Sequence, residues 1–196
     1  MKAHIINLPH RTDRKEAMIE QCQRLGIEPI FFEATNGKEA FPDEPRDLMK
    51  GHFGCLDSHK RLLSSIHGTA KYHVIFEDDA VLSDLVPEFI SVRPPESYDL
   101  VFMGGNTFQI ENAVSPWNEL FNRAHNVLCT HAYIIQDSAI LKLLEVLNSR
   151  QWKVDVLFTE FQKIANCYIT KECLSWQAVS HSDITGKVLD GNVLKY

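Results

Sequence analysis

The sequence lacks several features that would assign it to a broad class of proteins. No apolar run approaches the length of a membrane-spanning helix, and residues 1–9 lack the long apolar core of a signal peptide. The chain contains 20 Lys and Arg residues and 26 Asp and Glu residues, which gives a formal charge of −6, and the sequence contains no basic cluster. A mildly acidic chain of this kind is not expected to bind nucleic acid or an anionic membrane surface. These absences predict a cytoplasmic protein.

Cysteine is scarce and irregularly spaced. The five cysteines form no CxxC pair, and their number is odd. This pattern predicts reduced thiols in a cytosolic compartment and argues against a zinc site built on these cysteines.

The length and composition suit one domain. The chain has 196 residues, of which 44% are hydrophobic, and it contains no repeat, low-complexity tract or clear linker. A chain of this size can bury one substantial core. We therefore expect a single domain over residues 1–196.

Strand-like and helix-like patterns alternate from the start of the chain. Residues 3–8 and 30–32 are short apolar segments, and the segment between them has the spacing of an amphipathic helix. Thr12 or Asp13 can cap this helix, and Gly26 can end it. A strand–helix–strand opening predicts an α/β fold with a mixed, mostly parallel sheet flanked by helices.

The later segments continue this alternation. Helices are expected through residues 62–66, 138–147 and 154–164, and strands at 74–76, 99–103 and 167–174. Three segments are predicted to be irregular, namely 35–50, 107–122 and 175–196. The second of these is interpreted as a flap over the functional site.

Three consecutive acids follow the apolar strand at 74–76. Glu77, Asp78 and Asp79 stand where the strand ends, and ligands of open α/β sheets bind at the carboxyl ends of strands. Adjacent buried carboxylates repel one another, and a cation beside them removes that cost. Oxygen ligands suit Mg²⁺ or Mn²⁺. The segment predicts either a divalent metal site or an acidic turn.

Other polar groups also follow predicted strands or begin helices. Arginines after the first strand suit a phosphate or nucleotide, and glycines near a strand or helix end permit close approach of a ligand. Each group also has a structural alternative. For the arginines it is a solvated helix start, which these residues alone favour; for the group with the histidine it is a helix-entry loop; and for the group with two adjacent glycines it is an ordinary tight turn. The groups are Asn7 with Arg11 and Arg14; Gly51 and Gly54 with Ser58 and His59; and Gly104 and Gly105 with Asn106.

Two candidates lie near the end of the chain. Asp155 begins an amphipathic segment, where it can be a helix cap or face the site as a general base. His181 follows the last expected strand, where it can supply an imidazole to the same metal or belong to a surface loop.

Taken in order, these segments resemble the family 25 glycosyltransferases, which include bacterial lipooligosaccharide galactosyltransferases and procollagen galactosyltransferases. The resemblance spans nearly the whole chain, and its first three blocks are the most specific. The matching blocks are Ile6-Asn7-Leu8 with Arg11, Asp13 and Arg14; Gly54-Cys55 with Ser58-His59; Phe76 to Ala80; Asp99-Leu100 to Gly104; His131-Ala132-Tyr133; Val154-Asp155; and Gln177 with Ser182-Asp183-Ile184.

The resemblance implies a GT-A-like nucleotide-binding fold whose acidic motif holds Mn²⁺ or Mg²⁺. It implies transfer of galactose or glucose from a UDP-sugar to a hydroxyl of a glycan or glycoprotein acceptor, with inversion, as in surface polysaccharide or lipopolysaccharide synthesis. Donor binding would involve roughly residues 1–106, and acceptor binding and catalysis roughly 107–196. Membrane contact would be at most peripheral, through a lipid-linked acceptor.

The resemblance also implies roles for individual residues. Glu77 and Asp79 would flank the donor diphosphate, with Asp79 as the direct metal ligand and Asp78 beside them. Asp155 would be the general base and His181 a further metal ligand, while Asp183 suits either of these roles. The remaining donor contacts would be Asn7, Arg11 and Arg14 at the uridine and phosphate end, and His59 and Asn106 at the sugar or phosphate.

Two other classes compete with this interpretation. A metal-dependent phosphohydrolase would also use carboxylates at a strand end, and it would release phosphate or nucleotide without an acceptor. A non-catalytic sugar-nucleotide or glycan-binding module would bind UDP without turnover.

Overall fold

A computed structural model describes residues 1–91, 97–107, 110–184 and 188–189, and within these ranges the side chains of residues 180–181 and 188–189 are outside the description. Eight strands form one sheet in the order β2-β1-β3-β8-β5-β9-β7-β6. Their bounds are β1 Lys2–Asn7, β2 Glu28–Glu33, β3 Tyr72–Glu77, β5 Leu100–Phe102, β6 Val114–Pro116, β7 Phe121–Ala124, β8 Ala132–Gln136 and β9 Cys167–Thr170.

The sheet is mixed, and most of its strands run in one direction. β1 is parallel to β2 and β3, and β5 is parallel to β9, whereas β8 is antiparallel to both β3 and β5. β7 is antiparallel to β9 and β6. Only β8 and β7 of the eight strands therefore oppose the rest, so the carboxyl ends of β1, β2, β3 and β5 lie at one edge. The predicted fold class is confirmed.

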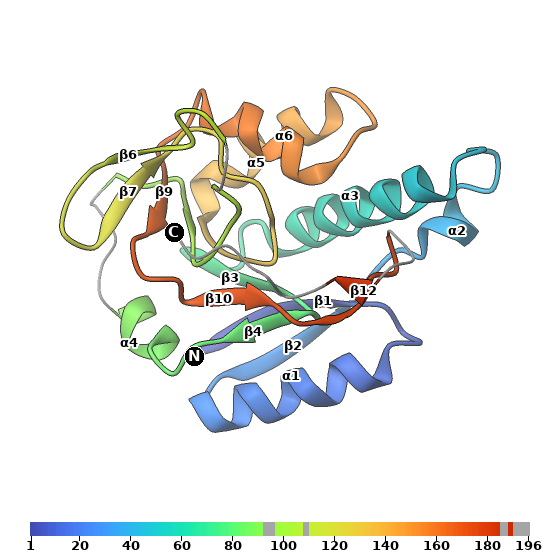
Figure 1. Ribbon diagram of the computed structural model, residues 1–196, viewed down its shortest axis with the longest axis horizontal. Helices are drawn as coiled ribbons and strands as arrows, with labels where there is room; N and C mark the ends of the chain where they lie inside the picture. Colours follow the sequence, from blue (N-terminus) through green and yellow to red (C-terminus); the bar gives the residue numbers. More distant parts are fainter. Residues whose placement is uncertain (92–96, 108–109, 185–187, 190–196) are drawn as a thin grey trace.

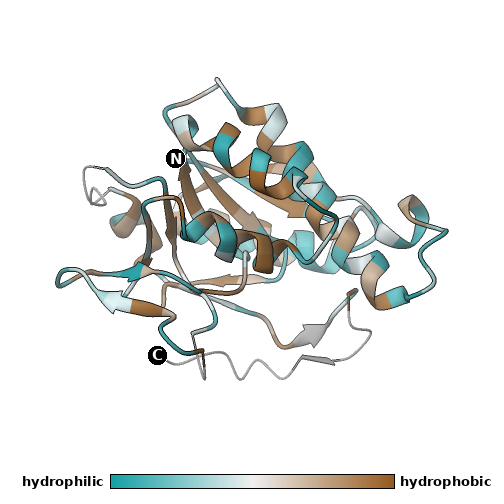
Figure 2. Ribbon diagram, turned by 90° about the horizontal axis from the view of Figure 1, so that it is seen from above, coloured by the Kyte–Doolittle hydropathy of each residue, from teal (hydrophilic) through white to brown (hydrophobic). Residues whose placement is uncertain are grey.

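Helices cover both faces of the sheet (Figure 1). One face packs against α3 (Asp47–Ile66), α5 (Asp137–Asn148) and α6 (Val154–Gln162), and the other against α1 (Thr12–Leu25) and α4 (Val86–Ser91). Side chains of β3 alternate between the two cores, with Ile75 in the first and Val74 and Phe76 in the second. Figure 2 shows hydrophobic central strands between helices that carry hydrophilic residues on their outer sides.

The opening of the chain folds as predicted, except for the helix cap. β1, α1 and β2 follow in order, and Gly26 ends α1 in the left-handed conformation, with φ of 65°. The N-cap is Arg11, rather than Thr12 or Asp13, and its side chain makes no capping hydrogen bond. The amphipathic face of α1 therefore matters more to this helix than its cap.

The predicted irregular segment 35–50 contains α2 (Gly37–Ala40) and the start of α3. Gly51 and Gly54 thus lie inside α3. Glycine is needed there because a Cβ at Gly54 would lie 2.7 Å from the carbonyl oxygen of Thr35, and one at Gly51 would lie 2.8 Å from the Cα of Ile184. The close approach predicted for these glycines is made by the protein's own backbone.

The described part of segment 107–122 does not line the cavity beside the acids, so the predicted flap is not found there. Its described part includes β6, which pairs with β7 at the sheet edge farthest from β2. The segment after β9 is also more regular than predicted, since β10 (Ser175–Gln177) pairs with β4 (Ala80–Leu82), and β11 (Ser180–His181) pairs with β12 (Val188–Leu189).

Among the helices of the described ranges, none has both the length and the apolar character required to cross a bilayer.

Candidate active site

The three acids lie where β3 leaves the main sheet. Glu77 is the last residue of β3, Asp78 and Asp79 form the turn, and β4 begins at the next residue. A cavity of about 400 Å³ opens beside them, at the edge formed by the carboxyl ends of β1, β2 and β3. All three acids line it, together with Arg14, Gln177 and residues 182–184. The structure therefore places the acids at a cavity, as the sequence predicts.

Asp79 carries a carboxylate oxygen without a protein partner. Its Oδ1 is buried and accepts no hydrogen bond, while Oδ2 lies 3.4 Å from Nε2 of Gln177 and 3.6 Å from a guanidinium nitrogen of Arg14. Burial, followed by the negative charge of Glu77, raises the pKa of Asp79 to about 7. A charged group of this kind is costly to bury without a counter-ion, so the oxygen is well suited to bind a cation.

Asp78 has the opposite character, because its oxygens are used within the fold. Oδ2 accepts from Nδ2 of Asn7 at 2.8 Å and from the backbone N–H of Leu8 at 3.4 Å, and Oδ1 accepts from Arg14 at 2.7 Å. These bonds join the end of β3 to the end of β1 and the start of α1. Asp78 is thus mainly a structural anchor, and it also holds Arg14 at the cavity.

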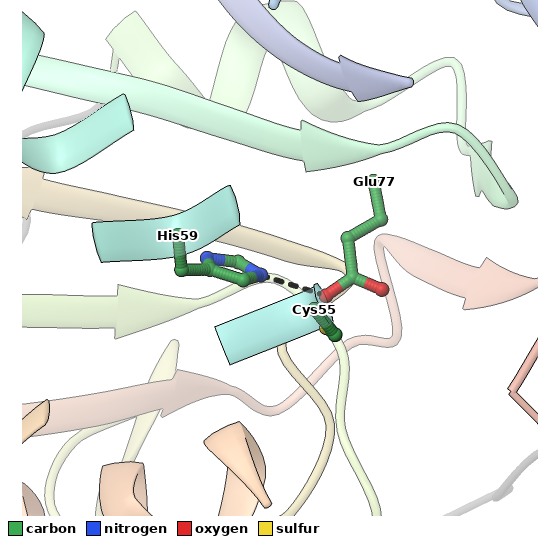
Figure 3. A group of neighbouring side chains, drawn as sticks. All are labelled: Cys55, His59 and Glu77. Carbon is green, nitrogen blue, oxygen red and sulfur yellow. Dashed lines mark hydrogen bonds and ion pairs between the residues drawn. The ribbon is translucent and has the colours of Figure 1, made fainter. Parts of the chain in front are cut away.

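Glu77 is fixed by two donors from different elements. Its Oε1 lies 3.0 Å from Nε2 of His59 on α3 and accepts from Oγ1 of Thr130 at 2.6 Å. Burial alone would raise the pKa of Glu77, but the bond and charge of His59 and the bond from Thr130 outweigh it, and the pKa is lowered. Glu77 is therefore ionised next to Asp79, and Figure 3 shows its second oxygen turned away from His59.

His59 supports Glu77 and does not line the cavity. Its side chain is fully buried, its Nδ1 lies 3.0 Å from the Tyr133 hydroxyl, and its ring packs edge-on against Phe158. The predicted direct contact with the donor is not supported by this position. His59 instead holds the carboxylate of Glu77 in place, with Tyr133 behind it.

The three residues predicted to bind the uridine and phosphate, Asn7, Arg11 and Arg14, do not all line the cavity. Arg14 lines the cavity, whereas Asn7 is buried and directs its amide to Asp78 and to the carbonyl of Arg11. Arg11 binds the carboxylates of Asp13 and Asp183. Arg11 and Asn7 therefore shape the edge of the cavity through these bonds.

Asn106 and its preceding glycines lie deeper than predicted. Asn106 pairs through its backbone with Leu128, and a Cβ at Gly104 would lie 1.8 Å from the carbonyl oxygen of Ser175. The space beside these glycines is thus filled by the protein's own backbone, so the structure gives no support for the predicted donor contact of Asn106.

Asp155 lies close to the cavity without lining it. Burial raises the pKa of the Cys55 thiol, and the charges of Glu77, Asp155 and Asp79 raise it further. Asp155 also acts on His52, which lines the cavity with Cys55. Its Oδ1 accepts from the backbone N–H of Val156 in the first turn of α6. Asp155 is not the helix cap, because the N-cap of α6 is Lys153 and no side chain caps the helix. Its site-facing role as a general base stays a prediction.

The last two candidates lie in the segment after β10. The backbone of His181 belongs to β11, but its side chain is outside the described part of the chain, so its role as a metal ligand stays a prediction. Asp183 lines the cavity and pairs with Arg11, and its Oδ1 lies 3.7 Å from Nε2 of His10.

One wall of the cavity was not recognised from the sequence. Four further residues that follow β2 line the cavity, namely Thr35, Asn36, Gly37 and Lys38. The available signal was their place at the carboxyl end of a strand next to β1, the same argument that identified the acids.

The residues present fit a hard divalent cation. Asp79 offers an oxygen that has no protein partner, and Glu77 offers an ionised carboxylate on the same strand end. Oxygen donors of this kind favour Mg²⁺ or Mn²⁺. Asp79 and Glu77 are therefore the residues that would hold the ion.

A model of a known protein family matches most of this chain. The model of glycosyltransferase family 25 (LPS biosynthesis protein) matches residues 1–158, which include β1, the acids and the start of α6. The chain belongs to glycosyltransferase family 25. This membership confirms the resemblance found in the sequence.

A relative in Drosophila melanogaster, a glycosyltransferase 25 family member, is 27% identical over 165 residues. The match covers 71% of this chain and 27% of the relative, so the chain spans about a quarter of that protein's length.

Two solved structures align with this chain at low sequence identity. The glycosyltransferase GlyE of Streptococcus pneumoniae TIGR4 aligns with a TM-score of 0.50 at 9% identity, over 86% of this chain and 44% of GlyE. A197 from STIV aligns over 100% of this chain and 96% of its own, with a TM-score of 0.49 and 12% identity. The likeness to GlyE agrees with a GT-A-like fold.

Proposed function

We propose that this family 25 chain is a metal-dependent, inverting glycosyltransferase. It would move a hexose, galactose or glucose, from a UDP-sugar to a hydroxyl of a glycan or glycoprotein acceptor. The observation that carries the proposal is the buried, unpartnered Oδ1 of Asp79 on the wall of a cavity large enough for part of a nucleotide sugar. The description of the family as LPS biosynthesis proteins supports a place in lipopolysaccharide or other surface polysaccharide synthesis. A lipid-linked acceptor would follow from such a place.

The charges of the cavity suit a diphosphate. Asp79 and Glu77 would hold Mn²⁺ or Mg²⁺, and Arg14 adds a guanidinium that Asp78 keeps at the cavity. When bound, the cation would neutralise the negative charge that develops on the departing UDP. The wall formed by residues 34–38 is left for the nucleoside.

The attacking hydroxyl also needs a proton acceptor. Inversion requires that the base lie on the face of the sugar opposite the leaving group, and a carboxylate near the cavity can take this proton. Asp155 is our candidate because its charge acts on Cys55 and His52 at the cavity wall while it lies on α6, away from the acid turn. Asp183 is the second candidate, although its pairing with Arg11 uses one of its oxygens.

We expect Asp155→Asn to lower turnover by about 100- to 10,000-fold, the range for loss of a general base, while UDP-sugar affinity changes less than about threefold. Steady-state kinetics and calorimetric titration of the donor separate the two effects. Glu160→Gln on the same helix, where Glu160 pairs with Arg150, is the matched control and should leave both quantities unchanged. Near-normal turnover with lowered stability would assign Asp155 to the helix start alone.

The function itself is tested with a panel of UDP-sugars in Mn²⁺, with UDP release measured with and without candidate glycan acceptors. Release that depends on both acceptor and Mn²⁺ supports transfer. Release of phosphate or nucleotide without an acceptor would indicate a phosphohydrolase, and UDP binding without turnover on any acceptor would indicate a binding module.

A further inference from the structure

One cluster at the cavity combines a thiol, an imidazole and a carboxylate. Sγ of Cys55, a ring nitrogen of His59 and a carboxylate oxygen of Glu77 all lie within 4.8 Å of one another (Figure 3). Cys55 and His59 are four residues apart on α3, so they lie on the same face of the helix, and Glu77 comes from the end of β3. We propose that these three side chains form a second metal site, specific for a thiophilic divalent cation such as Zn²⁺.

The ligand set differs from that of the acid turn. A tetrahedral zinc ion takes Cys, His and Glu at about 2.0 to 2.3 Å, which places its ligand atoms about 3.3 to 3.7 Å apart. Nε2 of His59 and Oε1 of Glu77 already lie 3.0 Å apart, so small rotations suffice to admit the ion. A thiolate and an imidazole favour Zn²⁺ over Mn²⁺ or Mg²⁺. Cys55 also lines the cavity, which gives the ion an entry path and a fourth position for water.

The surroundings have the outer partners that zinc sites require. Metal-bound histidines usually direct their second ring nitrogen to an oxygen, and Nδ1 of His59 lies 3.0 Å from the Tyr133 hydroxyl. Thr130 likewise donates to Glu77 at 2.6 Å. Both ligands are therefore held in place before any ion arrives.

Two protons must move when the metal ion binds Cys55 and His59. The Cys55 thiol loses its proton to solvent as the metal–sulfur bond forms. Nε2 of His59 must also be free of a proton to bind the metal. A charged ring releases that proton to solvent, whereas a neutral ring protonated at Nε2 changes tautomer, and in both cases Nδ1–H donates to Tyr133. Because the thiol must ionise, affinity should rise with pH.

The test measures metal binding directly, without any sugar nucleotide. Zn²⁺ affinity is obtained by competition with a chromophoric chelator in excess Mg²⁺, and Co²⁺ serves as the spectroscopic probe. We expect a tetrahedral Co²⁺ spectrum with a thiolate charge-transfer band that Zn²⁺ abolishes. Cys55→Ser should remove this band and weaken Zn²⁺ binding by more than the about 10- to 100-fold that loss of an outer partner costs.

Two variants serve as controls. The first control is Cys129→Ser. The charges of Asp155, Glu77 and Asp79 also raise the pKa of the Cys129 thiol, but Cys129 is outside the cluster, so this variant should keep the charge-transfer band. Asp79→Asn should bind Zn²⁺ within about threefold of the wild type, because Asp79 belongs to the other ligand set. Zinc binding in this variant separates the two metal sites.

The proposal is overturned if wild-type protein gives Co²⁺ spectra without a thiolate band, or if Cys55→Ser and Cys129→Ser bind Zn²⁺ equally. One consequence rests on the proposed function: Zn²⁺ held here withdraws Glu77 from the donor site and should inhibit transfer. A chain that binds Zn²⁺ through Cys55 but transfers no sugar would sustain this inference while the proposed function failed.

Discussion

Asp79→Asn is expected to lower Mn²⁺-dependent sugar transfer by about a thousandfold or more, with the fold intact. The substitution keeps the shape of the side chain but removes the charge of the buried Oδ1, which has no protein partner. A cation that stabilises a leaving group contributes several kcal/mol to the transition state, and each 1.36 kcal/mol is tenfold in rate. Initial rates of UDP release at saturating acceptor and varied Mn²⁺ measure the effect.

The free energy of unfolding of Asp79→Asn shows whether a loss of activity comes from a loss of fold. Asp79 is buried beside the ionised Glu77, and the Arg14 guanidinium that lies 3.6 Å from it pairs more closely with Asp78, at 2.7 Å. The neutral substitute should therefore be as stable as the wild type, or more stable, in the absence of metal. Asp84→Asn is the control, because Asp84 is 80% exposed in its side chain, and its activity should match the wild type. An Asp79→Asn enzyme with full Mn²⁺-dependent activity would refute the metal assignment.

Asp78→Ala is expected to lower the free energy of unfolding by about 3 kcal/mol, although the residue is adjacent to Asp79 in the sequence. The change removes the acceptor of the Arg14 and Asn7 bonds, and it leaves these buried groups short of a partner. Removing one member of a buried ion pair typically costs about 3 to 5 kcal/mol, and the nearby Asp79 compensates part of this. Urea unfolding followed by fluorescence and circular dichroism gives the value.

Asp13→Ala provides the matched comparison for this effect. Asp13 also pairs with an arginine of the β1–α1 region, but its side chain is 67% exposed, so its loss should cost less than about 1 kcal/mol. If Asp78→Ala and Asp13→Ala unfolded at the same urea concentration, the role of Asp78 as an anchor between β3 and β1 would be wrong.

The fold was predictable where apolar periodicity and glycine agreed. The opening strand–helix–strand unit is correct because α1 has a clear buried face and Gly26 ends it with a positive φ. Prediction failed between residues 35 and 50, where glycine, proline and charged residues suggested a loop. Gly37 and Gly54 instead let α2 and α3 pack backbone against backbone, and such a long-range contact leaves no local signature.

The site was predictable in position but not in its division of roles. The sequence correctly placed three acids at a strand end, yet adjacent carboxylates look alike until their neighbours are known. Asp78 accepts hydrogen bonds from Asn7 and Arg14, and Glu77 is hydrogen-bonded to His59 and Thr130. Asp79 has one carboxylate oxygen without a hydrogen-bond partner.

His59 shows a signal that the sequence did contain. It falls on the apolar face of α3 with Leu62 and Leu63, so the periodicity of the helix already favoured a buried histidine over a ligand contact. Cys55 lies four residues earlier on the same face, and its partner Glu77 comes from another element. A cluster assembled across elements in this way cannot be derived from cysteine spacing.

The central claim is that Asp79 and Glu77 hold a divalent cation against the diphosphate of a nucleotide sugar. The most direct measurement is calorimetric titration of UDP into the wild-type protein with Mn²⁺ and with EDTA, repeated with Asp79→Asn. We predict UDP binding at least about tenfold tighter with Mn²⁺ in the wild type, and equal, weak binding under both conditions in the variant. UDP affinity that is the same with Mn²⁺ and EDTA in the wild type would contradict the account.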